Sequence, residues 1–200
     1  MNRRSLLSGL IAAAAMSGKS HAARGVSLHE IAFDPALPVL GNPQGDVTIV
    51  EFFDYACPSC KAIHPQLKQM VATDGNIRLV MKDWPINGEI VLYAARMVLA
   101  ASSLGFYEKA HVAVMNITAR ALTHRNIDDA LRDAGVAPAA VRDALDLNMA
   151  AIDALLERNR AHAAHLQLIG TPSFLIGSRL YRGSLTPEQI SSAVAAARHR

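Results

Sequence analysis

The chain has 200 residues, of which 51% are hydrophobic, so it is long enough for one domain with a substantial core. Its formal net charge is +3, and Arg3, Arg4 and Lys19 near the start account for the whole excess. The remainder is neutral, and no lysine and arginine cluster with interleaved aromatic residues is present. The charge therefore does not indicate a nucleic acid or an anionic membrane as a partner.

Residues 1–22 have the pattern of a cleavable export signal. Two arginines form a basic start, residues 6–16 are largely apolar, and Ser20-His21-Ala22 offers small residues for cleavage. The apolar stretch is too short to cross a bilayer, and a retained helix or anchor is the alternative. The paired arginines also resemble a twin-arginine signal, so that route and the Sec route both remain open. Either route leads outside the cytoplasm, where a disulfide can persist.

The next part of the chain, residues 23–86, has the pattern of an α/β unit. Proline and glycine interrupt residues 23–46, which are expected to be loop with one short edge strand at 37–40. The pattern then predicts a buried strand, a helix and a second strand, over 47–54, 57–73 and 77–84. Pro65 is expected to kink the helix. Glu51 and Lys82 are anomalies in the two strands, because a charged group there is costly unless it is paired or neutral.

Residues 87–167 are expected to be helical. Apolar positions recur there at helical spacing in four stretches, over 90–104, 112–117, 127–134 and 138–156. The remaining residues, 168–200, predict a hairpin and a last helix, over 173–176, 180–182 and 186–197. The order indicates an α/β core with a helical insertion between its two halves.

The chain's two cysteines, Cys57 and Cys60, stand where the first predicted strand meets the first predicted long helix. At a helix start the first backbone N–H groups have no partner within the helix, and the helix dipole favours a thiolate. Cys57 would be the helix-start residue, with Cys60 one turn further in. This asymmetry suits a redox pair in which the outer sulfur attacks or is attacked and the inner one resolves the mixed disulfide.

Other readings of this pair stay open. A four-cysteine zinc site within one chain is excluded, but His64 could complete a three-ligand site with the cysteines and make this a copper- or zinc-handling protein. A structural disulfide would close too short a loop to restrict the unfolded chain much. The other histidines, His111 and His162 among them, are expected at surface polar positions.

Two segments resemble parts of one known fold. The stretch CPSCKAIHP resembles the active-site helix of the thioredoxin fold, and Thr171-Pro172 followed by SFLI resembles the cis-proline loop that faces the cysteines there. The helical insertion and the export signal narrow the resemblance to the DsbA-like branch of periplasmic thiol–disulfide oxidoreductases. It covers essentially the whole mature chain and implies a thioredoxin-like fold with the helical insertion.

The resemblance implies a role for each matching residue. Cys57 would be the nucleophile and Cys60 the resolving cysteine, while Thr171 and Pro172 would present backbone hydrogen bonds to an extended substrate. Pro58 and Ser59, between the cysteines, would also face the substrate. Glu51 matches the family's buried acid and Lys82 its basic partner, and we expect this pair to relay protons to and from Cys60. A purely structural ion pair is the alternative.

The implied function is dithiol–disulfide exchange on exported cysteine-containing proteins, without a cofactor or a metal. Disulfide formation is favoured, with a DsbB-like membrane oxidase as partner; reduction or isomerisation with a membrane reductase is the alternative, as is a non-catalytic chaperone. Ser59 stands where the best-known oxidase has histidine, so we expect a less stabilised thiolate and a less oxidising couple. Residues 23–46 are too short for the dimerisation domain of the isomerases, so a monomer is expected.

Overall fold

The computed structural model describes residues 26–118 and 120–199. The predicted export signal, residues 1–22, lies outside these ranges. Within them, no helix combines the length and the apolar character that crossing a membrane requires.

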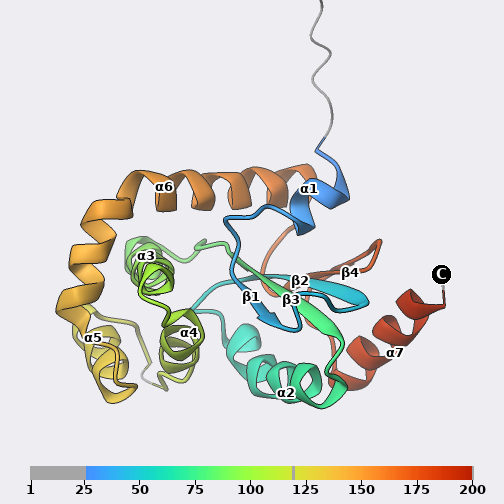
Figure 1. The fold of residues 1–200 in the computed structure, drawn as a ribbon, viewed down its shortest axis with the longest axis horizontal. Coiled ribbons are helices and arrows are strands. Elements are labelled where there is room, and N and C mark those ends of the chain that lie inside the picture. Colours follow the sequence, from blue (N-terminus) through green and yellow to red (C-terminus); the bar gives the residue numbers. More distant parts are fainter. Residues whose placement is uncertain (1–25, 119, 200) are drawn as a thin grey trace, which may run out of the picture.

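A five-stranded mixed sheet forms the centre of the molecule (Figure 1), with the strand order β1-β3-β2-β4-β5. Its strands are β1 (Val39–Gly41), β2 (Val47–Phe53), β3 (Ile77–Asp83), β4 (Ser173–Ile176) and β5 (Arg179–Arg182). β2 and β3 are parallel, whereas the other pairs are antiparallel. Almost every residue of β2 and β3 is buried, as expected for strands that helices cover on both faces.

Helices cover both faces of this sheet. In Figure 1, α2 (Pro58–Asp74) and α7 (Pro187–Arg198) lie on one side of it, and the long helix α6 (Pro138–His165) passes over the other. The helix α2 ends where Gly75 adopts a left-handed conformation (φ 73°), which glycine tolerates best. Pro65 lies inside α2, at the position expected.

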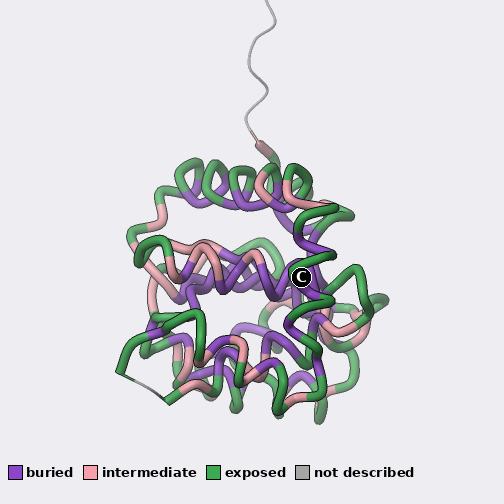
Figure 2. The backbone as a smooth tube through the Cα atoms, turned by 90° about the vertical axis from the view of Figure 1, so that its left-hand side faces the viewer, coloured by how far each residue is buried: buried purple, intermediate pink, exposed green. Residues whose placement is uncertain are grey.

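The segment between β3 and β4 is helical, as predicted. It holds α3 (Glu89–Ser103), α4 (Tyr107–Met115), α5 (His124–Asp133) and α6. Figure 2 shows buried residues on the sides of these helices that face the rest of the molecule. The helix α3 is buried or half-buried along nearly its whole length. The predicted fold class, an α/β core with a helical insertion, is therefore confirmed.

The expectation of loop alone before β1 is wrong for one short stretch, because residues Leu28–Ala32 form the helix α1. Ser27 and Glu30 cap each other's backbone N–H groups at the start of this helix. This reciprocal cap stabilises a single helical turn that has too few residues to show an apolar period.

Candidate redox site

Cys57 is the N-cap residue of α2, and Pro58 occupies the first helical turn. Proline suits that position because its missing N–H would have no partner in the helix. The Cys57 sulfur accepts a hydrogen bond from the backbone N–H of Cys60, 3.4 Å away. The serine or aspartate oxygen of an ordinary N-cap is thus replaced by a sulfur atom that can carry negative charge.

The two thiols have opposite protonation properties. Hydrogen bonding from the Cys60 thiol lowers the pKa of Cys57 to about 6, helped by backbone N–H groups of Ser59 and Cys60 and opposed by burial. The pKa of Cys60 is raised by that same hydrogen bond, by burial and by the neighbouring Glu51. At neutral pH, Cys57 is therefore mainly a thiolate and Cys60 a thiol. This is the division of roles that thiol exchange requires.

The residues around Cys57 form the rest of a thiol-exchange site. The peptide bond between Thr171 and Pro172 is cis, and the Cys57 sulfur lies 3.2 Å from the Thr171 carbonyl oxygen, to which it can donate only when it is protonated. Pro58 and Ser59 are exposed beside the largely buried Cys57. Within the described residues, the Ser59 hydroxyl makes no hydrogen bond to the sulfur, and the donors are the Cys60 thiol and the backbone at the start of α2.

Glu51 lies beneath the cysteines, on the α2 face of the sheet. It is completely buried, and neither carboxyl oxygen has a hydrogen-bond partner among the described residues. Burial, followed by the negative charge of Cys57, raises the pKa of Glu51 to about 8. A carboxyl group with this pKa is mainly protonated at neutral pH, so it can donate a proton.

The expected pairing of Glu51 with Lys82 is wrong. Glu51 is in register with Met81, whereas Lys82 is in register with Phe52, so the two side chains point to opposite faces of the sheet. The Lys82 ammonium group instead donates to Asn159 Oδ1 and contacts His162 Nδ1, both at 3.0 Å on α6. His162 is therefore buried and hydrogen-bonded, which also corrects its expected surface position.

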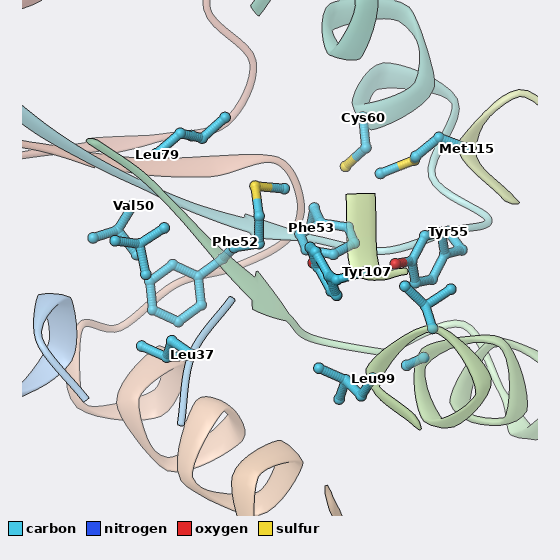
Figure 3. Packing of buried hydrophobic residues seen from close by; sticks show 14 of the residues in the cluster. Leu37, Val50, Phe52, Phe53, Tyr55, Cys60, Leu79, Leu99, Tyr107 and Met115 are labelled. Atoms are coloured by element: carbon cyan, nitrogen blue, oxygen red, sulfur yellow. The ribbon is translucent and has the colours of Figure 1, made fainter. Parts of the chain in front are cut away.

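Behind the active-site helix lies a buried aromatic and histidine cluster that the sequence interpretation missed. The Tyr55 hydroxyl and His111 Nδ1 are 2.9 Å apart, and the Tyr107 ring stacks on the His111 ring. The expectation that His111 is a surface residue is wrong, because its side chain is completely buried. Figure 3 shows Cys60 pointing from α2 into the same core as Tyr55 and Tyr107.

His64 belongs to this cluster and not to a metal site with the cysteines. It is buried, and its ring packs edge-on against the ring of His111, with the ring centres 4.8 Å apart. Among the residues that the structure describes, no three histidine, cysteine or acidic side chains are arranged to hold a metal ion.

Asp54 is a further residue of the site that the sequence interpretation passed over. It follows β2 directly and is 1% exposed. Its carboxylate accepts hydrogen bonds from a backbone N–H group in the redox loop, residues 54–57, and from another in the loop after β3. The sequence feature that could have identified Asp54 is its position, because it is an acidic residue at the end of a buried strand and three residues before Cys57.

Comparisons with known proteins agree with this geometry. A protein-family model described as Thioredoxin matches residues 34–196. The solved structure of a thioredoxin-like oxidoreductase from Silicibacter pomeroyi DSS-3 is 36% identical, covers 88% of this chain and 99% of that chain, and has a TM-score of 0.82. The thiol-disulfide exchange protein alpha-DsbA2 from Wolbachia pipientis is 29% identical, with coverages of 84% and 90% and a TM-score of 0.79. The predicted thioredoxin-like fold is thereby confirmed.

Curated proteins add two kinds of relative. A putative protein-disulfide oxidoreductase from Rickettsia conorii is 27% identical over 78% of this chain and 58% of that protein. The Na(+)/H(+) antiporter NhaA 3 from Salinispora tropica is 28% identical over 80% of this chain but only 24% of its own length. The chain thus spans about a quarter of the antiporter and less than two thirds of the oxidoreductase.

Proposed function

This chain belongs to the thioredoxin family, and on that premise we propose that it is a DsbA-like thiol–disulfide oxidoreductase that forms disulfides in exported proteins. One observation carries the proposal: an N-cap cysteine with a pKa of about 6 lies beside a buried cysteine whose pKa is raised. Stabilising the Cys57 thiolate stabilises the reduced form of the pair, so the disulfide form gives up its oxidising equivalents readily.

In the oxidising direction, a substrate thiolate attacks the Cys57 sulfur of the Cys57–Cys60 disulfide. The bond between the two cysteines breaks, a mixed disulfide forms at Cys57, and Cys60 leaves as a thiolate. Protonated Glu51 transfers its proton to Cys60, whose raised pKa favours the thiol. Glu51 is then reprotonated from solvent.

The second step releases the product. The substrate's other thiolate attacks its own sulfur in the mixed disulfide, and Cys57 leaves as a thiolate. A thiol of low pKa is the better leaving group, which favours this release. The substrate has then lost two electrons and gained a disulfide, and the enzyme holds both electrons as its dithiol.

The cis-proline loop, Thr171-Pro172, supports the proposal because its backbone lies against Cys57, where an extended substrate segment would pair.

The test is the reduction potential of the Cys57–Cys60 couple, measured by equilibration with glutathione. A disulfide donor should have a potential well above that of thioredoxin, towards about −120 mV. A potential near about −270 mV would instead make the protein a reductant, and the oxidase proposal would fall. Because Ser59 stands where the best-known oxidase of this family has histidine, we expect a reduction potential more negative than about −120 mV.

We further propose that the protein works as a monomer in the periplasm and is reset by a membrane oxidase of the DsbB type. Trapping the thiols in cells by acid quench and alkylation should find Cys57 and Cys60 oxidised when the membrane oxidase is present and reduced when it is deleted. A pair that is reduced in both strains would favour the alternative, a reductase or isomerase maintained by a membrane reductant.

A further inference from the structure

Asp54 occupies the junction between two loops at the edge of the sheet that carries the redox site. One carboxyl oxygen, Oδ1, accepts the N–H of Ala56 at 2.7 Å in the loop before α2. The other, Oδ2, accepts the N–H groups of Ile86 at 2.8 Å and Asn87 at 3.1 Å, in the loop after β3. The backbone carbonyl of Asp54 also accepts the N–H of Cys57 at 3.1 Å.

This bonding pattern requires a carboxylate. An Asx-turn at Asp54 needs only the hydrogen bond from the Ala56 N–H to one side-chain oxygen, and asparagine or serine can also accept that bond. The bonds from Ile86 and Asn87 need a second acceptor oxygen on the same side chain. An amide has only one oxygen, and its NH₂ group would face backbone N–H groups that are themselves donors.

The position of Cys57 depends on the loop that Asp54 holds. Two residues separate Asp54 from Cys57, and Asp54 holds both Ala56 and Cys57 through their N–H groups. The sulfur must sit at the end of α2 to receive the hydrogen bond from Cys60. A small displacement of the loop would lengthen this contact, because charge-assisted hydrogen bonds depend steeply on geometry.

We propose that Asp54 is a positioning residue that ties the redox loop to the loop after β3 and thereby keeps the Cys57 thiolate stabilised. The functional consequence, a more oxidising Cys57–Cys60 couple, rests on the proposed thiol-exchange function. The positioning of Cys57 by Asp54 does not depend on that function.

Two substitutions separate geometry from charge. Asp54→Asn removes the negative charge and one acceptor, whereas Asp54→Glu keeps the charge and displaces both acceptors by one methylene group. If Asp54 acts by positioning, both variants should raise the pKa of Cys57 by about half a unit or more, because both weaken its N–H donors. The equilibrium constant for the oxidation of glutathione by the Cys57–Cys60 disulfide should fall about threefold to tenfold. This fall corresponds to a reduction potential that is ~15–30 mV more negative.

The pKa is read from the pH profile of Cys57 alkylation in the reduced protein, which requires no enzymatic activity. Asp34→Asn is the matched control, because Asp34 also accepts a backbone N–H two residues ahead, from Ala36, but belongs to a different loop. It should leave the Cys57 profile unchanged. Urea unfolding of the oxidised and reduced forms is measured alongside.

Three results would overturn the inference. A lower pKa in Asp54→Asn with no change in Asp54→Glu would mean that Asp54 acts only through its charge. Equal destabilisation of both redox forms with an unchanged Cys57 profile would mean a purely structural role. If neither variant folds, Asn87→Pro decides, because it removes one donor and keeps the carboxylate, and an unchanged profile there would count against positioning. A wild-type protein that fails to exchange disulfides would remove the proposed function but leave these pKa comparisons valid.

Discussion

At the scale of single residues, the Cys57 thiolate depends first on the thiol of Cys60. We therefore expect Cys60→Ala to raise the pKa of Cys57 by about one unit or more, since the substitution removes a donor. Cys60→Ser is the matched control, because its hydroxyl keeps a donor in place and should hold the pKa near the wild-type value. The pH dependence of alkylation measures both variants with a single reactive thiol. Equal profiles for the two variants would show that the backbone of α2 alone stabilises the thiolate.

Glu51 is the residue that we expect to couple exchange to proton transfer. It is buried and on the same face of the sheet as α2, it has no hydrogen-bond partner in the described part of the chain, and its pKa is raised to about 8. Glu51→Gln keeps the shape but cannot donate a proton, so the exchange rate at neutral pH should fall about tenfold or more. The rate profile should also lose an inflection near pH 8. The exposed acid Glu89 provides the control, as Glu89→Gln should keep both the rate and the inflection; a Glu51→Gln profile like that of the wild type would contradict the relay.

At the scale of elements, Lys82 connects the sheet to α6 and not to the redox site. Its ammonium group bonds Asn159 and contacts His162, and Asn159 in turn donates to the Asp83 carbonyl oxygen at 3.0 Å. Lys82→Met should leave two buried acceptors unpartnered and lower the free energy of unfolding by about 1–3 kcal/mol in urea. The reduction potential and the pH–rate profile should not change, nor should either change in the exposed control Lys109→Met. An altered pH–rate profile in Lys82→Met would restore Lys82 to the proton relay.

The element order was predictable because long periodic segments carry their own signal. The strands of the core and the helices of the insertion follow from apolar spacing, glycine stops and the proline that opens α6. His111 lies four residues after Tyr107 and four before Met115, on the buried side of α4. This helical spacing could have predicted that His111 is buried. The helix α1 was not, since one turn held by a capping pair shows no period.

The Glu51–Lys82 error has a different physical origin. Each residue was correctly recognised as a charge in a buried strand. The face on which a side chain lies, however, depends on the register between β2 and β3, and a shift of one residue reverses the face. Pairing between strands that are separated by a helix is set by tertiary packing, which neither strand's pattern contains. Asp54 was missed for a similar reason, because its partners Ile86 and Asn87 lie on a loop distant in the sequence.

At the scale of the whole molecule, the redox site joins the two halves of the thioredoxin core across the inserted helices. Cys57 comes from the loop after β2, and Thr171 comes from the segment that follows α6. The contact between them therefore forms only when the insertion has returned the chain to the sheet. The site is thus a property of the completed core, although both of its motifs are short and local in sequence.

Two buried carboxyl groups should make the stability of the whole protein depend on pH. Glu51 and Asp83 are both completely or almost completely buried, and burial raises the pKa of each to about 8. In the unfolded chain both would ionise near pH 4, so between about pH 4 and pH 8 the folded state holds protons that the unfolded state has released. Their contribution to stability is therefore fully present at low pH and is lost as pH rises to about 8.

The double variant Glu51→Gln/Asp83→Asn isolates this contribution. Lys82, His162 and Cys57 have lowered pKa values and act in the opposite direction, but the first two are present in both proteins and cancel in the difference. Using the oxidised form removes the titration of Cys57. We expect the free energy of unfolding of the variant, relative to wild type, to increase by roughly 3 kcal/mol or more between pH 5 and pH 8. A constant difference in urea unfolding across that range would show that the two acids are ionised in the folded protein, and a proton could then not pass from Glu51 to Cys60.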